Sequence, residues 1–258
     1  MHPLVTIAEN AARSAGQIIV RAADRLDRVT VTEKSANDFV TDIDQEAEQE
    51  IIGVIHKAYP NHSILSEESG AIGEDHEIVW IVDPLDGTRN FINGLPHFCV
   101  SIAVQIRGKI EHGVIYDPIR DETFTASRGR GAKLNNTRLR ISQRTKLEKA
   151  LVGTGFPFRN TELTETYLNM FTKVFPQTGD IRRGGSAALD LAYVAAGRLD
   201  AFWEMDLKIW DIAAGSLLIK EAGGLVSDFT GSENYLESGN IVAGNPKLFK
   251  ALLQLIAS

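Results

Sequence analysis

The chain of 258 residues has a single cysteine, Cys99, and only six histidines, which are scattered along it. One thiol excludes an internal disulfide framework, and so few thiol and imidazole groups exclude a zinc ribbon. The apolar runs are short, and none approaches the ~20 residues of a membrane span. The first residues also lack the basic start and apolar block of a secretory signal. We therefore expect a cytoplasmic protein that does not associate with membranes.

Basic residues are in the minority, because 27 lysines and arginines face 34 acidic residues, for a formal net charge of −7. This balance argues against a dedicated DNA-binding protein, which needs a cationic surface for the phosphate backbone. Charge is nevertheless uneven, since residues 128–146 contain seven basic side chains and no acid. Such a stretch is typical of a solvated hairpin. An interaction face is the alternative, as it is for Arg182 and Arg183.

No repeat, low-complexity tract or linker rich in proline, glycine or serine divides the chain. Hydrophobic periodicity predicts helices at 4–19, 44–59, 162–174, 186–197, 211–221 and from 246 to the end. Strands are predicted at 63–65, 78–82, 99–106, 112–116, 122–127, 150–156, 201–204, 225–229 and 240–244. Helices mixed with strands in both halves favour a layered α/β sandwich (α+β layered) over a bundle or a barrel. We expect one domain over residues 1–258, with sheet-containing halves of about 1–148 and 149–258.

The most informative motif lies at residues 78–91, IVWIVDPLDGTRNF, where an apolar strand runs directly into Asp83 and Asp86. Asp-Pro and Asp-Gly pairs alone would indicate a tight turn. Two aspartates at the carboxyl end of a strand, however, occupy the usual ligand position of α/β sheets. The Gly-Thr-Arg-Asn that follows would open a helix whose free backbone N–H groups face an anion. The motif therefore predicts a site for a metal and a phosphate.

Further carboxylates fit the same site. Glu67 and Glu68 follow a predicted strand, whereas Asp211 begins a predicted helix, where a plain N-cap is the alternative. Asp44 opens another helix, where a solvated acidic face is equally compatible with the sequence. If the four main candidates converge, they cannot all stay ionised without a cation: Glu67, Asp83, Asp86 and Asp211. An oxygen-only ligand set selects Mg²⁺ first and Mn²⁺ or Ca²⁺ next, and argues against zinc.

Three motifs together resemble the signatures of the inositol monophosphatase family: Glu-Glu-Ser at 67–69, DPLDGTRNF at 83–91 and WDIAAG at 210–215. The resemblance covers nearly the whole chain, and segments 34–44, 95–104, 155–158 and 184–204 are most similar to the bacterial SuhB-type branch. It implies an αβαβα sandwich, a homodimer and hydrolysis of myo-inositol monophosphates and other small phosphomonoesters. It also implies dependence on Mg²⁺, with Mn²⁺ as a substitute and Li⁺ as an inhibitor.

Carried over by position, the resemblance implies metal ligands at Glu67, Asp83, Asp86, Asp211 and the carbonyl of Leu85. Asp86 would also be catalytic, and Thr88 with Glu67 would orient the attacking water. The amides of Gly87 and Thr88 would hold the phosphate. Five residues would contact the hydroxyl groups of the substrate: Gly185, Ser186, Ala187, Glu204 and Asp211. Lys34 matches a mobile loop and would contact substrate. Asp44 matches a weaker third metal site.

Two departures from the family pattern concern the substrate. Arg89 stands where the family usually has threonine; it would aid an anionic substrate or pair with a surface carboxylate. Phe156-Pro157-Phe158 replaces a serine-containing loop of animal relatives. The SuhB-type branch is also associated with ribosomal RNA transcription, where it acts together with Nus factors on RNA polymerase. A transcription antitermination component, with catalysis secondary, is therefore the alternative function.

Overall fold

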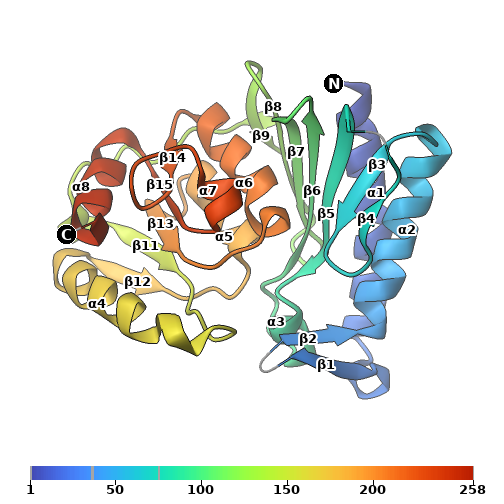
Figure 1. Cartoon of the computed structure of the whole chain (residues 1–258), viewed down its shortest axis with the longest axis horizontal. Helices are drawn as coiled ribbons and strands as arrows, with labels where there is room; N and C mark the ends of the chain where they lie inside the picture. The colour runs from blue at the N-terminus through green and yellow to red at the C-terminus, as the bar shows by residue number, and fades with distance from the viewer. Residues whose placement is uncertain (1, 36–37, 75, 258) are drawn as a thin grey trace.

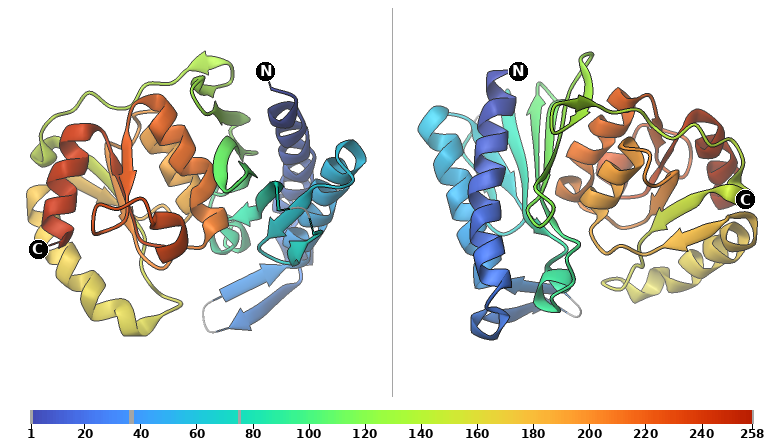
Figure 2. Two further views of the ribbon diagram at one scale, coloured as in Figure 1. Left: turned by 45° about the horizontal axis from the view of Figure 1, so that its top comes forward. Right: turned by 180° about the vertical axis from the view of Figure 1, so that it is seen from behind.

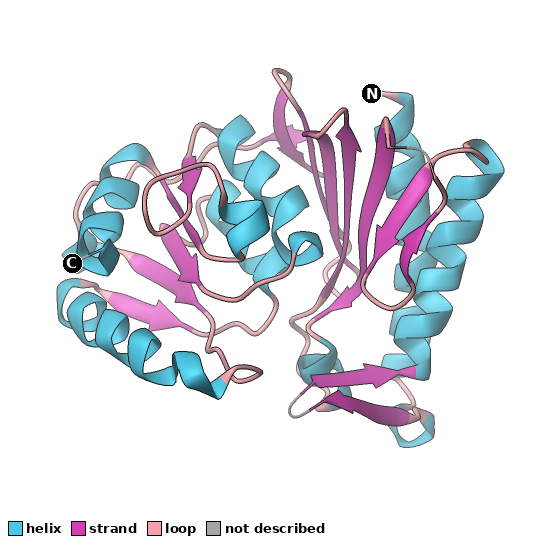
Figure 3. Ribbon diagram, in the orientation of Figure 1, coloured by secondary structure: helices cyan, strands magenta, loops and turns pink. Residues whose placement is uncertain are grey.

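Two β-sheets alternate with three layers of helices in the computed structural model, which describes residues 2–35, 38–74 and 76–257 (Figure 1). The order of layers is helices, an eight-stranded sheet, helices, a five-stranded sheet and helices, as the colouring by element type shows (Figure 3). The predicted αβαβα sandwich is confirmed. No helix in the described residues is long and apolar enough to cross a membrane.

The first helical layer consists of α1 (Pro3–Ala23) and α2 (Asp42–Ala58), which lie side by side on the outer face of the larger sheet (Figure 2). The buried side of α1 repeats at helical spacing and is rich in alanine, which lets α2 approach closely. Helix α2 begins two residues before its predicted start, because Thr41 and Asp44 form a reciprocal capping box. Asp44 thereby acquires a structural role at this helix start.

The larger sheet has the strand order β10-β9-β8-β7-β6-β5-β3-β4 and is antiparallel except for the parallel pair β3–β5. Its strands are β3 (Ser63–Ser66), β4 (Gly70–Ile72), β5 (Ile78–Asp86), β6 (Cys99–Ile106), β7 (Lys109–Asp117), β8 (Glu122–Ser127), β9 (Gly131–Leu134) and β10 (Thr137–Arg138). Strands β5 and β6 are interior strands of this sheet, and both are almost entirely buried. Their carboxyl and amino ends, respectively, meet at the edge where the aspartate motif lies.

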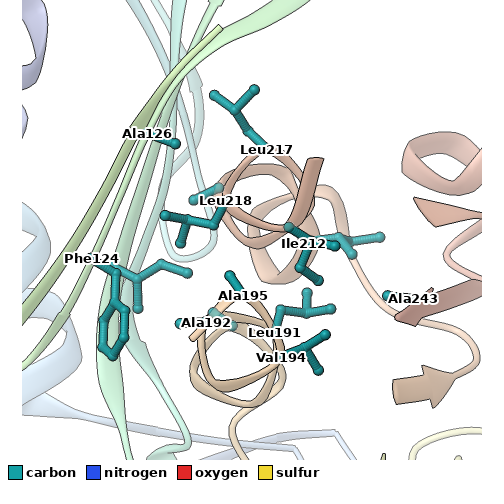
Figure 4. Packing of buried hydrophobic residues seen from close by; sticks show 14 of the residues in the cluster. Phe124, Ala126, Leu191, Ala192, Val194, Ala195, Ile212, Leu217, Leu218 and Ala243 are labelled. Carbon is teal, nitrogen blue, oxygen red and sulfur yellow. The ribbon is translucent and has the colours of Figure 1, made fainter. Parts of the chain in front are cut away.

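The middle layer, α5 (Ala187–Ala195) and α6 (Ile209–Ala222), is buried on both sides (Figure 4). Leu217 and Leu218 of α6 lie against Phe124 and Ala126 of β8, whereas Val194 of α5 belongs to the same apolar cluster as Ala243 of the second sheet. Full burial of one such large apolar side chain contributes about 1.5–3 kcal/mol. Both sheets therefore depend on these two helices.

The second sheet has the order β12-β11-β13-β15-β14, with strands β12 (Asp180–Arg182), β11 (Leu151–Thr154), β13 (Ala201–Glu204), β15 (Ile241–Gly244) and β14 (Leu225–Ser227). Its outer face is covered by α4 (Thr164–Val174) and α8 (Pro246–Ala257). Trp203 is fully buried in this layer, among Leu248, Leu252 and Tyr167. All strands of this sheet lie after residue 150, and all strands of the larger sheet lie before residue 139.

Several short elements differ from the prediction. A hairpin of β1 (Val31–Ser35) and β2 (Asp38–Thr41) occupies the segment that the resemblance matched to a mobile loop. Helix α3 (Thr88–Ile92) is the helix predicted to open after the aspartate motif, whereas α7 (Tyr235–Ser238) and strands β4, β9, β10 and β12 are too short for a periodic signal. Helix α6 begins at Ile209, before the predicted 211, because the N–H of Lys208 is capped by the side chain of Asp211. Asp211 therefore lies inside the first turn and is not the N-cap residue.

The contact between β7 and α6 leaves no space at Gly113, where an added Cβ would lie 3.0 Å from Cα and O of Ala214. We expect Gly113→Ala to lower the free energy of unfolding by about 1–3 kcal/mol, because backbone must shift to admit the methyl group. Gly53→Ala is the matched control, since nothing lies within 4 Å of its added Cβ on α2. That change should be neutral or stabilising by up to about 1 kcal/mol. Urea denaturation of both variants measures the difference; equal stabilities would contradict the tight contact.

A candidate metal and phosphate site

A pocket lies where the carboxyl end of β5 meets the starts of α3, α5 and α6. Its lining includes the acids of the aspartate motif together with side chains from the loops that follow β11 and β13. The sequence-predicted residues that line it are Glu67, Asp83, Leu85, Asp86, Gly87, Thr88, Arg89, Gly185, Ser186, Ala187, Glu204 and Asp211. Segments more than 140 residues apart in the chain therefore meet at one place.

An irregularity in β5 allows Asp83 and Asp86 to share this pocket. Along a regular strand, residues three apart point to opposite faces of the sheet. Here Asp83 pairs with Ser101 and Asp86 with Cys99, so three steps along β5 match two steps along β6. The extra residue is a β-bulge, which re-aims one side chain. Both aspartates consequently reach the same side.

One carboxylate oxygen each from Asp83, Asp86 and Asp211 lies within 4.8 Å of the other two, and all three residues are buried. Each carboxylate also accepts a backbone N–H that fixes its position. Leu85 N donates to Asp83 Oδ1 over 3.0 Å, Ala188 N donates to Asp86 Oδ2 over 2.7 Å, and Lys208 N donates to Asp211 Oδ2 over 2.8 Å. The three carboxylates are thus held in place before any ligand binds.

The repulsion among these buried carboxylates raises their pKa values. Burial, and next the charges of Glu67, Asp86 and Asp211, raise the pKa of Asp83 well above its usual range. Burial and the nearby Asp86 raise the pKa of Asp211 to about 7, and burial raises that of Asp86 against the hydrogen bonds from Ser186 and Ala188. Carboxylates at this spacing are stable only when protons or cations offset their charge.

Glu67 is the fourth predicted acid and forms the pocket wall beside the cluster. Its backbone N–H donates to the carbonyl of Val82 over 3.2 Å, which ties it to β5. The loop that carries it is anchored by the buried Glu48, whose Oε1 accepts the N–H groups of Glu68 and Ser69. From the sequence, Glu48 was only one acid in the first half of a helix. No local pattern identifies it as an anchor, because its partners lie about 20 residues away.

Thr88 occupies the first position of α3, directly after Gly87, whose φ of 98° is the left-handed conformation that favours glycine. Thr88 Oγ1 lies 2.9 Å from Asp44 Oδ1 and 3.1 Å from the carbonyl oxygen of Leu85. The second oxygen of Asp44 accepts the N–H and hydroxyl of Thr41. Asp44 is therefore buried behind Thr88, and the three-carboxylate cluster does not include it.

Residues predicted to contact substrate come from the start of α5 and the end of β13. Ser186 is the N-cap residue of α5, but its hydroxyl donates to Asp86 Oδ2 over 2.7 Å and makes no cap bond. Gly185 and Ala187 flank it in the pocket, and Glu204 faces them from β13. Burial and the charge of Asp190 raise the pKa of Glu204 well above its usual range. The side chain of Lys34 falls outside the described part of the structure.

Two further residues adjoin the cluster. Cys99 is fully buried, and its sulfur lies 3.9 Å from Asp86 Oδ2 and 3.6 Å from Ser186 Oγ. His97 packs behind the site, where its Nε2 lies 3.1 Å from Asp190 Oδ1. Asn90 joins this region by donating to the carbonyls of His97 and Gly184 over 2.6 and 3.0 Å. Asn90 and Asp190 were not singled out from the sequence, where each is an ordinary polar residue.

The ligand chemistry of the pocket is that of a hard cation. Its buried donors are carboxylates, and the described residues place no histidine nitrogen in the cluster. Such donors suit Mg²⁺, Mn²⁺ or Ca²⁺. The start of α3 adds backbone N–H groups that have no partner within the helix and can face an anion. The residues present therefore fit both a divalent cation and a phosphate group.

Known proteins of similar sequence and fold identify the family of this chain. The relative named Nus factor SuhB from Pseudomonas aeruginosa is 59% identical over 261 residues, which cover 99% of this chain and 96% of the relative. The extragenic suppressor protein SuhB from Bartonella henselae has a crystal structure that matches with a TM-score of 0.96 at 45% identity, over 99% of this chain and 98% of that one. The inositol monophosphatase from Anabaena matches with a TM-score of 0.87 at 37% identity, over 98% and 94% of the two chains.

The predicted similarity to the SuhB-type branch is thereby confirmed. The family match extends over residues 1–258 and so includes all three motifs and both sheets. This chain belongs to the inositol monophosphatase family.

Proposed function

We propose that the protein is a Mg²⁺-dependent phosphatase that hydrolyses myo-inositol monophosphates and similar small phosphomonoesters to the alcohol and inorganic phosphate. The observation that carries this proposal is the buried cluster of Asp83, Asp86 and Asp211, with one oxygen of each within 4.8 Å of the others. Membership of the inositol monophosphatase family supports the reaction class. The cluster alone supports a hard divalent cation.

Phosphomonoester hydrolysis needs acceleration of up to ~10²¹-fold, and one general acid or base supplies only about 10²–10⁴. Divalent cations held by the aspartates and Glu67 would supply an activated water and positive charge for the leaving oxygen. The chain's own groups position the reactants. The amides of Gly87 and Thr88 receive the phosphate oxygens. Thr88 Oγ1, between Asp44 and the Leu85 carbonyl, orients the water together with Glu67.

Hydroxyl groups of the alcohol would meet the opposite wall of the pocket, formed by Gly185, Ala187 and Glu204. Glu204 is suited to this contact because its raised pKa favours the protonated form, which both donates and accepts hydrogen bonds. Ser186 would position Asp86 through its 2.7 Å hydrogen bond, and would contact substrate only indirectly.

The first test is the metal dependence of phosphate release from myo-inositol 1-phosphate. We expect activity with Mg²⁺, lower activity with Mn²⁺ and inhibition by Li⁺. Chelation with EDTA should abolish activity. Asp83→Asn should lower kcat by more than about 100-fold, because even outer-shell partners of a metal site cost 10–100-fold. Asp27→Asn is a control, since Asp27 is exposed in the short helix at residues 26–28 and does not line the pocket. Full activity after exhaustive chelation would contradict the proposal.

The raised pKa values also predict how the metal-free protein responds to pH. Asp211 has a folded pKa of about 7 against an ordinary value of 3.8, so between these values the folded state binds more protons than the unfolded state. Stability without metal should therefore fall as pH rises from about 4 to 7. Asp211→Asn should flatten this slope and raise Tm at pH 8 in EDTA while abolishing activity. Thermal melts of both proteins across pH measure this; a lower Tm for the variant at pH 8 would refute it.

We propose, as a second candidate function, that the chain also binds a component of a transcription complex, either RNA polymerase or a Nus factor. Relatives at 51–59% identity carry the name Nus factor SuhB, and the structure offers a suitable surface. Strand β10 is an exposed edge of the larger sheet, next to Arg140. Arg128 and Arg144 of the basic stretch pair with Glu111 and Asp200, but its other cations have no ion pair among the described residues: Arg130, Lys133, Arg138, Arg140 and Lys146.

Charge reversal on this edge should separate the two functions. The pairing row from Asp83 through Ser101 to Thr137 crosses five strand spacings, or roughly 24 Å along the sheet. That exceeds the Debye length of about 8 Å, so Arg138→Glu with Arg140→Glu should change kcat/KM by less than about twofold. The same double variant should lose capture of RNA polymerase or purified Nus factors, whereas Asp83→Asn should retain it. Equal capture by the charge-reversed and wild-type proteins would rule out this surface.

A further inference from the structure

A group of polar side chains lies behind the pocket, where the first half of the chain meets the second. Asn90, in α3, donates from Nδ2 to the carbonyl of His97 over 2.6 Å and to that of Gly184 over 3.0 Å. The imidazole Nε2 of His97 in turn lies 3.1 Å from Oδ1 of Asp190, in α5. We call Asn90, His97 and Asp190 the polar junction. They are not among the described residues that line the pocket.

The polar junction is buried and closely packed. Asn90 is 5% exposed, and the side chains of His97 and Asp190 are 20% and 5% exposed. Burial raises the pKa of Asp190, although hydrogen bonds from the side chain of His97 and the backbone of Gly184 oppose this rise. A Cβ added to Gly184 would overlap Oδ1 of Asp190 and Nε2 of His97. The backbone at Gly184 is therefore held directly against the imidazole–carboxylate pair.

On one side, the polar junction supports the proposed phosphate position. Gly87 precedes α3, and a Cβ added to it would lie 3.0 Å from the carbonyl oxygen of His97. The loop that carries His97 is fixed by Arg120, which donates to the carbonyl of Pro96 over 2.8 Å and pairs with the buried Asp117. The backbone of Gly87 thus rests on an anchored segment.

On the other side, the polar junction holds the turn before α5, where the proposed hydroxyl contacts begin. Gly184 and Gly185 have no side chains that could pack, and Gly185 has a φ of 91°. Glycine also loses more conformational freedom on folding than any other residue. Helix α5 itself is fixed by apolar packing, which can keep its hydrogen bonds to Asp86 in place. The turn, in contrast, depends on the bonds from Asn90 and to Asp190.

We propose that His97, paired with Asp190 and bridged by Asn90, is a positioning residue that sets the distance between the phosphate-binding amides and the hydroxyl-binding wall of the pocket. The inference rests on the proposed phosphatase function. It gives His97 a part in substrate selectivity, although its side chain does not touch the substrate. Esters with ring hydroxyls depend on the polar junction, whereas esters without hydroxyls do not.

The experiment compares myo-inositol 1-phosphate with cyclohexyl phosphate, which has the same six-membered carbon ring without the hydroxyls. The readout is the ratio of kcat/KM for the inositol ester to that for the cyclohexyl ester, at saturating Mg²⁺. His97→Phe keeps an aromatic ring beside Tyr193 but loses the bond to Asp190. His97→Gln is the conservative variant, because its amide can place an N–H donor near the position of the imidazole Nε2.

His112→Phe is the matched control. His112 is also a buried histidine with a side-chain hydrogen bond, which joins its Nδ1 to Ser127 Oγ over 2.9 Å. It pairs with Val104 of β6, five residues from the Cys99 that pairs with Asp86, or roughly 17 Å along the strand. Loss of a buried histidine at this distance should leave the ratio within about twofold.

We expect His97→Phe to lower the ratio by about tenfold, through a higher KM for the inositol ester, because one or two hydrogen bonds to its hydroxyls weaken. His97→Gln should restore the ratio. An unchanged ratio in His97→Phe, or a wild-type ratio near one, would overturn the positioning role and leave the phosphatase function intact. If the wild type hydrolyses neither ester, the phosphatase function fails instead. Hydrogen–deuterium exchange at residues 183–187 then decides whether His97 holds the turn, because equal exchange in wild type and His97→Phe would overturn it.

His97→Phe leaves the buried carboxylate of Asp190 without its partner, which lowers stability. Should this variant fail to fold, His97→Phe combined with Asp190→Leu takes its place, because both partners are then apolar and no buried charge remains. The double variant should show the same selective loss and faster exchange at residues 183–187. A wild-type ratio in the folded double variant would overturn the proposal.

Discussion

Mutual repulsion among three buried aspartates is the constraint on which the rest of this structure depends. Asp83, Asp86 and Asp211 bring carboxylate oxygens within 4.8 Å of one another in a site shielded from water. Removing a carboxylate from water costs several kcal/mol unless an opposite charge accompanies it. The fold tolerates this cost because N–H groups hold each carboxylate and because raised proton affinities let protons stand in for cations. Without a counter-charge, the carboxylate cluster is thus an electrostatically unfavourable feature of the fold.

The layered architecture is what keeps such a cluster from dispersing. Asp83 and Asp86 belong to the larger sheet, Asp211 belongs to α6, and the N–H that holds Asp86 belongs to α5. Helices α5 and α6 form the apolar layer between the sheets, so any separation of the halves would expose a large buried surface. The alanine and leucine packing of that layer therefore also sets the distances between carboxylates. Function and stability share the same helices.

Much of this arrangement could be predicted from the sequence, because it follows from local patterns. Long helices and buried strands have clear periodicity, and the aspartate motif with its partner near Trp210 identified the three aspartates that the fold brings together. Three features could not be predicted. The β-bulge that aligns Asp83 with Asp86 depends on register against β6. Glu48 acts on a loop distant in sequence, and Arg89 lies over the rings of Phe39 and Phe158, which come from separate segments. These contacts join segments that are distant in the sequence, and therefore no periodic pattern indicates them.

The acidic site and the basic edge occupy distant strands of one sheet, which bears on whether the chain is a catalyst, a binding component or both. The interior strand β5 carries Asp83 and Asp86, and the edge strand β10 carries Arg138. A partner bound along the edge need not cover the pocket, so neither function excludes the other on geometric grounds. Selection for binding alone, however, gives no physical reason to retain a destabilising carboxylate cluster. Asparagine at those positions would preserve the shape and remove the repulsion. The presence of all three carboxylates therefore supports the proposed cation-dependent chemistry over a role in binding alone.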